Sequence, residues 1–183
     1  MGLLAIGAGL VFGGSIVLLA TFFRTKDERY DRIAEWGFVL FAVLGIPAMV
    51  VTAGRLADGG TVVGWATVLG GAGVLGLGMG ELGSSLGRVD FRRIAPLMTA
   101  GFLLFLVWIG VMSWVILAMG ALPAGLGWLG LGSITLGIAI VMWIMRDPLV
   151  RRAEKDPGTA GMTLFFVPLV GLVAWMVWLG LVL

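Results

Sequence analysis

The chain has 183 residues; 60% are hydrophobic, 12 are basic, 10 are acidic, and there is no cysteine or histidine. A soluble domain is usually about 45–50% apolar and about 25% charged, so this composition excludes an ordinary water-soluble globule. The missing residue types also exclude disulfides, thiol redox chemistry, His-ligated haem and most zinc sites.

Six long apolar segments alternate with short stretches that hold every charged residue, at 24–35, 55–58, 81–93 and 146–156. A helix needs roughly 20 apolar residues to cross the hydrocarbon core of a bilayer. Continuous apolar runs favour helices, since the strands of membrane barrels alternate apolar and polar residues. The sequence therefore predicts an all-α, polytopic membrane protein, a single transmembrane domain over 1–183. Its six spans are 2–23, 33–54, 61–80, 94–119, 124–145 and 159–182.

Basic residues indicate the orientation of these spans. Eleven of the twelve lie in the first, third and fifth loops, and the second and fourth loops hold only Arg55. Cytoplasmic loops carry such an excess of Lys and Arg. We expect an integral protein of a prokaryotic plasma membrane, with both termini outside and loops 24–32, 81–93 and 146–158 in the cytoplasm.

Several charged residues stand at the predicted inner boundary of the membrane. Glu35 and Glu81 are the acidic residues nearest to the spans, and we expect helix-end or ion-pair roles, with gating or ion coordination as the alternative. Basic residues at the same level orient the chain or bind lipid headgroups. The interfacial charge candidates are Glu35, Glu81, Arg88, Arg92 and Arg93.

Tryptophan positions agree with an aromatic belt at each membrane face. Trp65, Trp128, Trp175 and Trp178 fall near predicted outer ends, and Trp36 and Trp143 fall near inner ends. Two further tryptophans, Trp108 and Trp114, lie deeper and are candidates for lining a pocket.

Internal similarity suggests three tandem helical hairpins over about 1–57, 58–121 and 122–183. Residues 37–43 and 101–107 share five of seven identities, and Arg24, Arg88 and Arg152 follow the same step of 64 residues. Each hairpin uses two spans, so all three would face the same way around a pseudo-threefold axis.

Glycine is concentrated in the first, third and fifth spans, and seven glycines lie in the third alone. Small residues allow helix backbones to approach closely in lipid. We expect these glycines to pack helices against each other within the chain. The alternative is that one glycine-rich helix face binds another subunit. The helix-contact candidates are Gly9, Gly13, Gly70, Gly73, Gly76, Gly80, Ser133 and Gly137, and the kink candidates are Pro47 and Pro168, which lie inside predicted spans.

Catalytic and cofactor motifs are not found. No acidic residue lies at mid-membrane, both lysines lie in loops, and no glycine-rich segment continues into a phosphate-binding motif. We therefore expect no cofactor, no metal and no enzyme activity. Mixed-sign loops argue against nucleic-acid binding, so the expected partners are membrane lipids with other membrane subunits or a second copy.

Three functions stay open at this level. An accessory or structural subunit of a larger membrane complex fits the missing chemistry and the glycine-rich faces best. A small transporter or channel is the alternative, and it predicts a central path lined by hydroxyl groups within the spans. A lipid-modifying membrane enzyme is the third possibility, since the inner charged clusters hold carboxylates and arginines.

Overall fold

The computed structural model describes residues 2–87, 91–146 and 159–183. For residues 91, 92, 141, 143–146 and 159–166 it describes the backbone alone. This part of the chain is all-helical and contains no strand, which confirms the predicted all-α class. The elements are α1 (Gly2–Thr25), α2 (Glu28–Arg55), the 3₁₀-helix η1 (Ala57–Gly59), α3 (Gly60–Ser85), α4 (Phe91–Met119), α5 (Ala124–Arg146) and α7 (Thr159–Val182).

The turn between α1 and α2 is much shorter than the predicted loop 24–32. Lys26 takes a left-handed conformation with φ of 58°, and Asp27 caps α2 by accepting a hydrogen bond from the Arg29 backbone N–H at 3.0 Å. Glu28 and Asp31 follow in the first turn, where the helix dipole favours acidic side chains. The helix α2 therefore begins before the predicted apolar span 33–54 and includes charged residues. A helix can continue outside the hydrocarbon, where its charged side chains are solvated.

The end of α4 depends on one glycine. Gly120 follows the last helical residue with φ of 64°, a left-handed conformation that costs glycine little. Its N–H donates to the carbonyl of Ile116 at 3.0 Å and so satisfies one of the free carbonyl groups at the helix end. Pro123 follows, and α5 begins at Ala124.

Four segments are long and apolar enough to cross a membrane: α1, α2, η1 with α3, and residues 93–119 of α4. The apolar stretches described in the last two helices are shorter, Ala124–Ile140 in α5 and Val167–Val182 in α7. These lengths make the fold compatible with membrane insertion.

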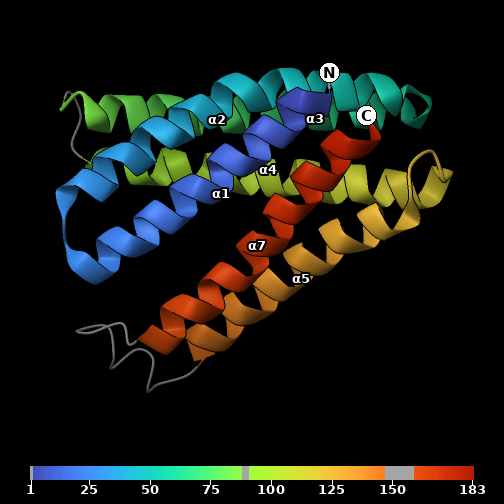
Figure 1. Ribbon diagram of the computed structural model, residues 1–183. Helices are drawn as coiled ribbons and strands as arrows, with labels where there is room; N and C mark the ends of the chain where they lie inside the picture. The colour runs from blue at the N-terminus through green and yellow to red at the C-terminus, as the bar shows by residue number, and fades with distance from the viewer. Residues whose placement is uncertain (1, 88–90, 147–158) are drawn as a thin grey trace.

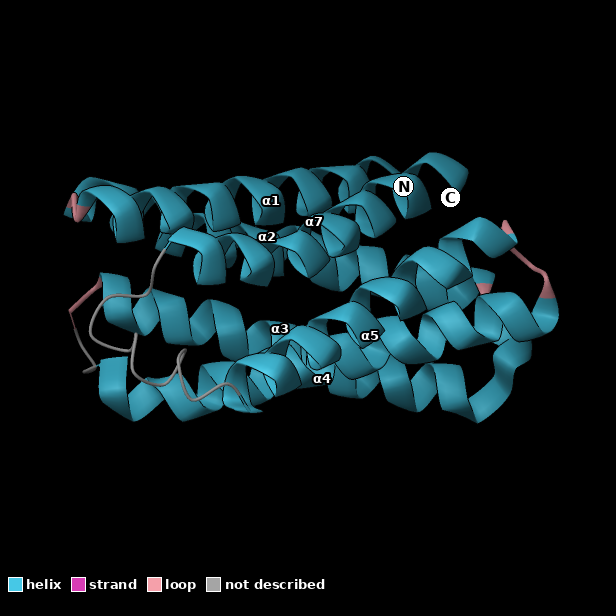
Figure 2. Ribbon diagram, turned by 90° about the horizontal axis from the view of Figure 1, so that it is seen from below, coloured by secondary structure: helices cyan, strands magenta, loops and turns pink. Residues whose placement is uncertain are grey.

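The helices form a closed ring. Each helix packs against the helix before it and the helix after it in sequence, and α1 also packs against α7 (Figure 1). The two termini consequently lie close together at one end of the bundle (Figure 1). Viewed from the second direction, α1, α2 and α7 lie on one side and α3, α4 and α5 on the other (Figure 2).

Aromatic side chains from four helices fill the interior of the ring. Phe12 of α1 lies 4.9 Å from Phe41 of α2, measured between ring centroids, and both rings contact Phe105 of α4. Trp108 stacks on Phe105, and its far side meets Trp175 of α7 edge-on at 5.6 Å. Edge-to-face and offset pairs of this kind contribute about 0.5–1.5 kcal/mol each beyond simple burial.

The tryptophans divide between the surface and this interior. Trp36, Trp65 and Trp128 are at least half exposed, as the aromatic-belt interpretation requires. Trp175 was expected in the same belt, but it is fully buried. The reason is that α7 closes the ring and therefore contacts helices on two sides, which a uniformly apolar sequence does not reveal.

Helix backbones approach closely where small residues face each other. A Cβ atom added to Gly73 of α3 would come within 2.5 Å of the Gly101 carbonyl oxygen of α4 and within 2.8 Å of the Leu104 Cβ. Gly71, two residues earlier, has no atom within 4 Å of its Cβ position. The two glycines therefore provide a matched pair, one inside the helix contact and one outside it.

We predict that Gly73→Ala destabilises the bundle by about 1–3 kcal/mol, because the added methyl forces α3 and α4 apart. Gly71→Ala should leave stability unchanged or slightly raised, since alanine has the higher helix propensity. Thermal unfolding in a mild detergent, followed by circular dichroism, measures both. Equal transition temperatures for the two variants would contradict the assignment of Gly73 to the contact.

Candidate functional site

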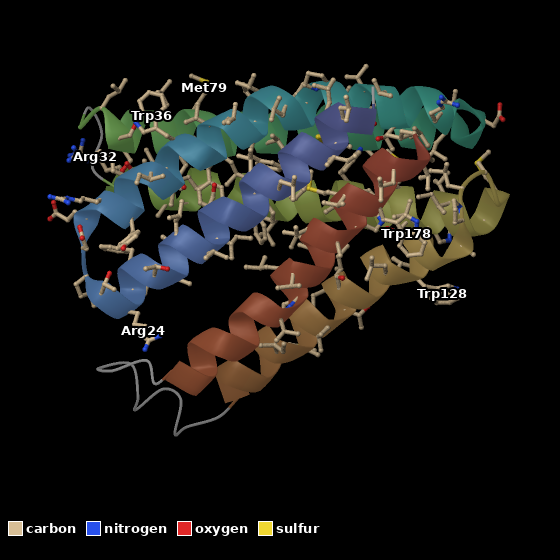
Figure 3. All side chains as sticks on the ribbon, in the orientation of Figure 1. Arg24, Arg32, Trp36, Met79, Trp128 and Trp178 are labelled. Carbon is tan, nitrogen blue, oxygen red and sulfur yellow. The ribbon has the colours of Figure 1, made fainter. Side chains whose placement is uncertain are left out.

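Three features interrupt the apolar bundle: a group of carboxylates at one end, a set of buried polar atoms in the interior, and glycines distributed between inner and outer faces. The carboxylates lie at the end opposite the chain termini, where Figure 3 shows Arg32 and Trp36 on α2.

The carboxylate group joins the two predicted interfacial acids. Glu35 on α2 and Glu81 on α3 are half-buried and face the same space at the α2–α3 contact, together with Asp31 one turn before Glu35. Ser84 forms a side-chain hydrogen bond with Glu35, and the Arg32 charge lies nearby. Within the described residues, no group of three acidic side chains is placed to hold a metal ion.

The predicted basic candidates are only partly placed. Arg93 is exposed near the start of α4. Arg88 lies outside the described residues, and the same holds for the side chain of Arg92. The carboxylate group is therefore the part of the predicted inner boundary that the structure describes, and ionised carboxylates accept hydrogen bonds.

Three buried polar atoms gather between α4, α5 and α7. Trp108 Nε1, Ser113 Oγ and Trp175 Nε1 are buried and have no hydrogen-bond partner among the described residues. A Cβ added to Gly130 of α5 would contact the Ser113 hydroxyl and would lie 2.7 Å from Trp175 Nε1, so α5 approaches closely at this point. Of the two deeper tryptophans predicted to line a pocket, Trp108 is buried here, whereas Trp114 is wrong for that role because 58% of its surface is exposed. The pairing of Trp108 with Trp175 depends on ring closure.

Hydroxyl groups within the helices mostly satisfy themselves. The Ser15, Thr52, Thr67, Thr99 and Ser133 hydroxyls each donate to the carbonyl four residues earlier, at 2.7 to 2.9 Å. Such bonds keep the polar atoms on their own helix. These five side chains, which the sequence offered as lining for a path, are therefore already bonded.

The glycine candidates lie mainly at helix contacts. Gly9 and Gly13 of α1 face α7, while Gly70, Gly73 and Gly80 of α3 face α4. Gly76 is nearly open, since its Cβ position lies 3.9 Å from Leu97 Cδ1. On α5, Ser133 meets Gly171 and Gly137 lies 3.5 Å from Pro168 of α7, again measured from the Cβ position.

The two proline candidates have different surroundings. Pro47 is exposed on α2, and Pro168 is buried against α5. Both helices continue through their proline.

Comparison with known proteins provides no family for this chain: no protein-family model, no curated protein and no solved structure matches it.

Ser113→Ala tests the interior polar group. A buried hydroxyl without a partner costs about 1–3 kcal/mol, so we expect its removal to leave the melting temperature unchanged or raised. Ser133→Ala is the matched control, because this hydroxyl is bonded to the Leu129 carbonyl and also faces a glycine. We expect the control to lose about 0.5–1.5 kcal/mol. A larger loss for Ser113→Ala would show that its hydroxyl is hydrogen-bonded in the folded protein.

Proposed function

We propose that the chain is a six-span membrane bundle of three helical hairpins that serves as an accessory subunit of a larger membrane complex, without a catalytic centre of its own. The six helices, four of span length, and the confinement of charge to the ends of the bundle support the membrane part of this proposal. The glycines on the outer face of α3 support the subunit part.

Similar close crossings within the three hairpins support the repeat. In each, a small residue of the first helix faces a glycine of the second. The facing pairs are Ser15 with Gly37, Gly73 with Gly101, and Ser133 with Gly171. Of these positions only Gly37 and Gly101 are separated by the step of 64 residues, so the support lies in the similar type of crossing and not in its register.

Two observations weigh against the transport alternative along the ring axis. The interior is occupied by the Phe12, Phe41, Phe105, Trp108 and Trp175 rings, which contact one another across the ring. A water-filled path needs polar groups that face it, and the helix hydroxyls described above are bonded to their own backbones.

The outer face of α3 carries the subunit proposal. Gly64 and Gly71 have nothing within 4 Å of their Cβ positions, and they lie beside the exposed side chains of Val68 and Leu75. Internal packing gives no reason for glycine at either position, and glycine weakens a helix that has no contact there. A second transmembrane helix that packs closely on this face supplies that reason, because small residues permit backbone contact in lipid.

Purification from the native membrane in mild detergent tests the subunit role. We expect a partner of fixed stoichiometry by mass spectrometry, and we expect Gly71→Leu to release it by blocking close approach. Ala139→Leu on α5 is the control, because Ala139 is exposed and alanine is favourable in a helix without any partner. A monodisperse monomer that retains no protein, or equal retention by both variants, contradicts the proposal.

The proposed orientation places the termini and the α2–α3 turn outside the cell. The chain lacks cysteine, so single cysteines report accessibility without background. We expect Asp58→Cys to react with a membrane-impermeant maleimide in intact cells and Lys26→Cys to react only after lysis. The opposite pattern would invert the topology, and reaction of both sites in intact cells would contradict a membrane-spanning bundle.

A further inference from the structure

A groove opens along the contact that closes the ring. Near the termini α1 and α7 are tightly packed: a Cβ on Gly9 would lie 3.0 Å from Met176 Cβ, and one on Gly13 would lie 3.1 Å from Val173 Cγ1. The ribbons of α1 and α7 move apart from the termini toward the opposite end of the bundle (Figure 1). The diverging part contains a groove of about 700 Å³.

The groove has apolar walls and one charged end. Gly14 lies on its floor and has nothing within 4 Å of its Cβ position. Arg24 is the charged side chain among its described lining residues, and it stands in the last turn of α1 beside Thr21 and Thr25. The side chain of Arg24 extends from the end of α1 (Figure 3). The apolar walls are formed mainly by Leu10, Ile16, Val17, Leu169, Val170 and Val173.

The dimensions of the groove fit an extended hydrocarbon chain. Along α1 the lining runs from Leu10 to Thr25, a rise of about 22 Å at 1.5 Å per residue. Half of a bilayer's hydrocarbon core is about 15 Å, so the groove reaches from the middle of the membrane to one surface. A long apolar groove that ends at a cation matches a lipid, which joins an apolar chain to a charged headgroup.

We propose that this groove binds one anionic glycerophospholipid, with an acyl chain along the apolar walls and the phosphate at Arg24. A guanidinium group forms paired, charge-assisted hydrogen bonds with phosphate oxygens, which fixes the headgroup at this end. The glycine floor leaves room for the chain methylenes. The inference rests on the membrane location proposed above and is independent of the subunit role.

The test uses the purified full chain, delipidated in detergent and examined by native mass spectrometry. The probes are phosphatidylglycerol and phosphatidylcholine with the same acyl chains, and glycerol 3-phosphate as a soluble headgroup. We expect one retained phosphatidylglycerol per chain, bound about tenfold more tightly than phosphatidylcholine, because both lipids offer a phosphate to Arg24 but the choline cation of phosphatidylcholine neutralises its headgroup and repels the guanidinium. Glycerol 3-phosphate should not displace it, because the acyl chain supplies much of the contact.

Two variants separate the parts of the site. Arg24→Gln should abolish the preference for phosphatidylglycerol, whereas Arg29→Gln, a neighbouring exposed arginine outside the groove, should keep it. Gly14→Leu should fill the groove and weaken both lipids at least fivefold, whereas Gly132→Leu should weaken neither. Circular dichroism melting of each variant checks that it folds.

Equal retention of the two lipids by the native chain would overturn the proposal. So would unchanged binding in Gly14→Leu or Arg24→Gln, or full displacement by glycerol 3-phosphate. These measurements use the isolated chain, so they are unaffected if no partner subunit exists. Failure of the membrane location itself would instead appear in the cysteine-accessibility experiment.

Discussion

Close approach of helix backbones at small residues is the contact on which this bundle depends. Nearly every helix is apolar along its whole length, so in lipid no contrast between apolar protein and polar solvent decides how the helices associate. What remains is the quality of packing. Where Gly73 meets the Gly101 carbonyl, or Gly171 meets Ser133, the helices come close enough for continuous van der Waals contact.

The interior of the bundle, in contrast to the helix contacts, is filled by large side chains. A ring of six helices must fill the space on its axis, and aromatic side chains from α1, α2, α4 and α7 do so. Among the described residues, Ser113 Oγ and Trp175 Nε1 lie near Gly130 without a hydrogen-bond partner, and Trp108 Nε1 is a third buried polar atom without one.

Two features of the outer surface are candidates for specific binding. The outward glycines of α3 and the groove between α1 and α7 lie on different helices and suit different occupants. The glycines of α3 form an open face on which a helix can lie. The groove has apolar walls and a cation at one end. If both proposals hold, a lipid occupies the seam that closes the ring while a protein partner uses the opposite part of the surface.

The sequence alone determined the helical class and the positions of the helices. Long apolar runs bounded by charge specify a helix wherever they occur, so the predicted segments 94–119 and 159–182 agree with α4 and α7 to within a few residues. Charge clusters likewise located the carboxylates Glu35 and Glu81, although only the structure brought them to one contact.

Only the tertiary structure decided which face of each helix is inside. In α7 the apolar residues surround the helix evenly, so no periodicity distinguishes the buried Trp175 from the exposed Val170. For the same reason the sequence does not separate Gly73, inside a contact, from Gly71, outside it. Ring closure between α1 and α7 joins residues more than 150 positions apart, and both the buried tryptophan pair and the groove between these two helices follow from that one long-range contact.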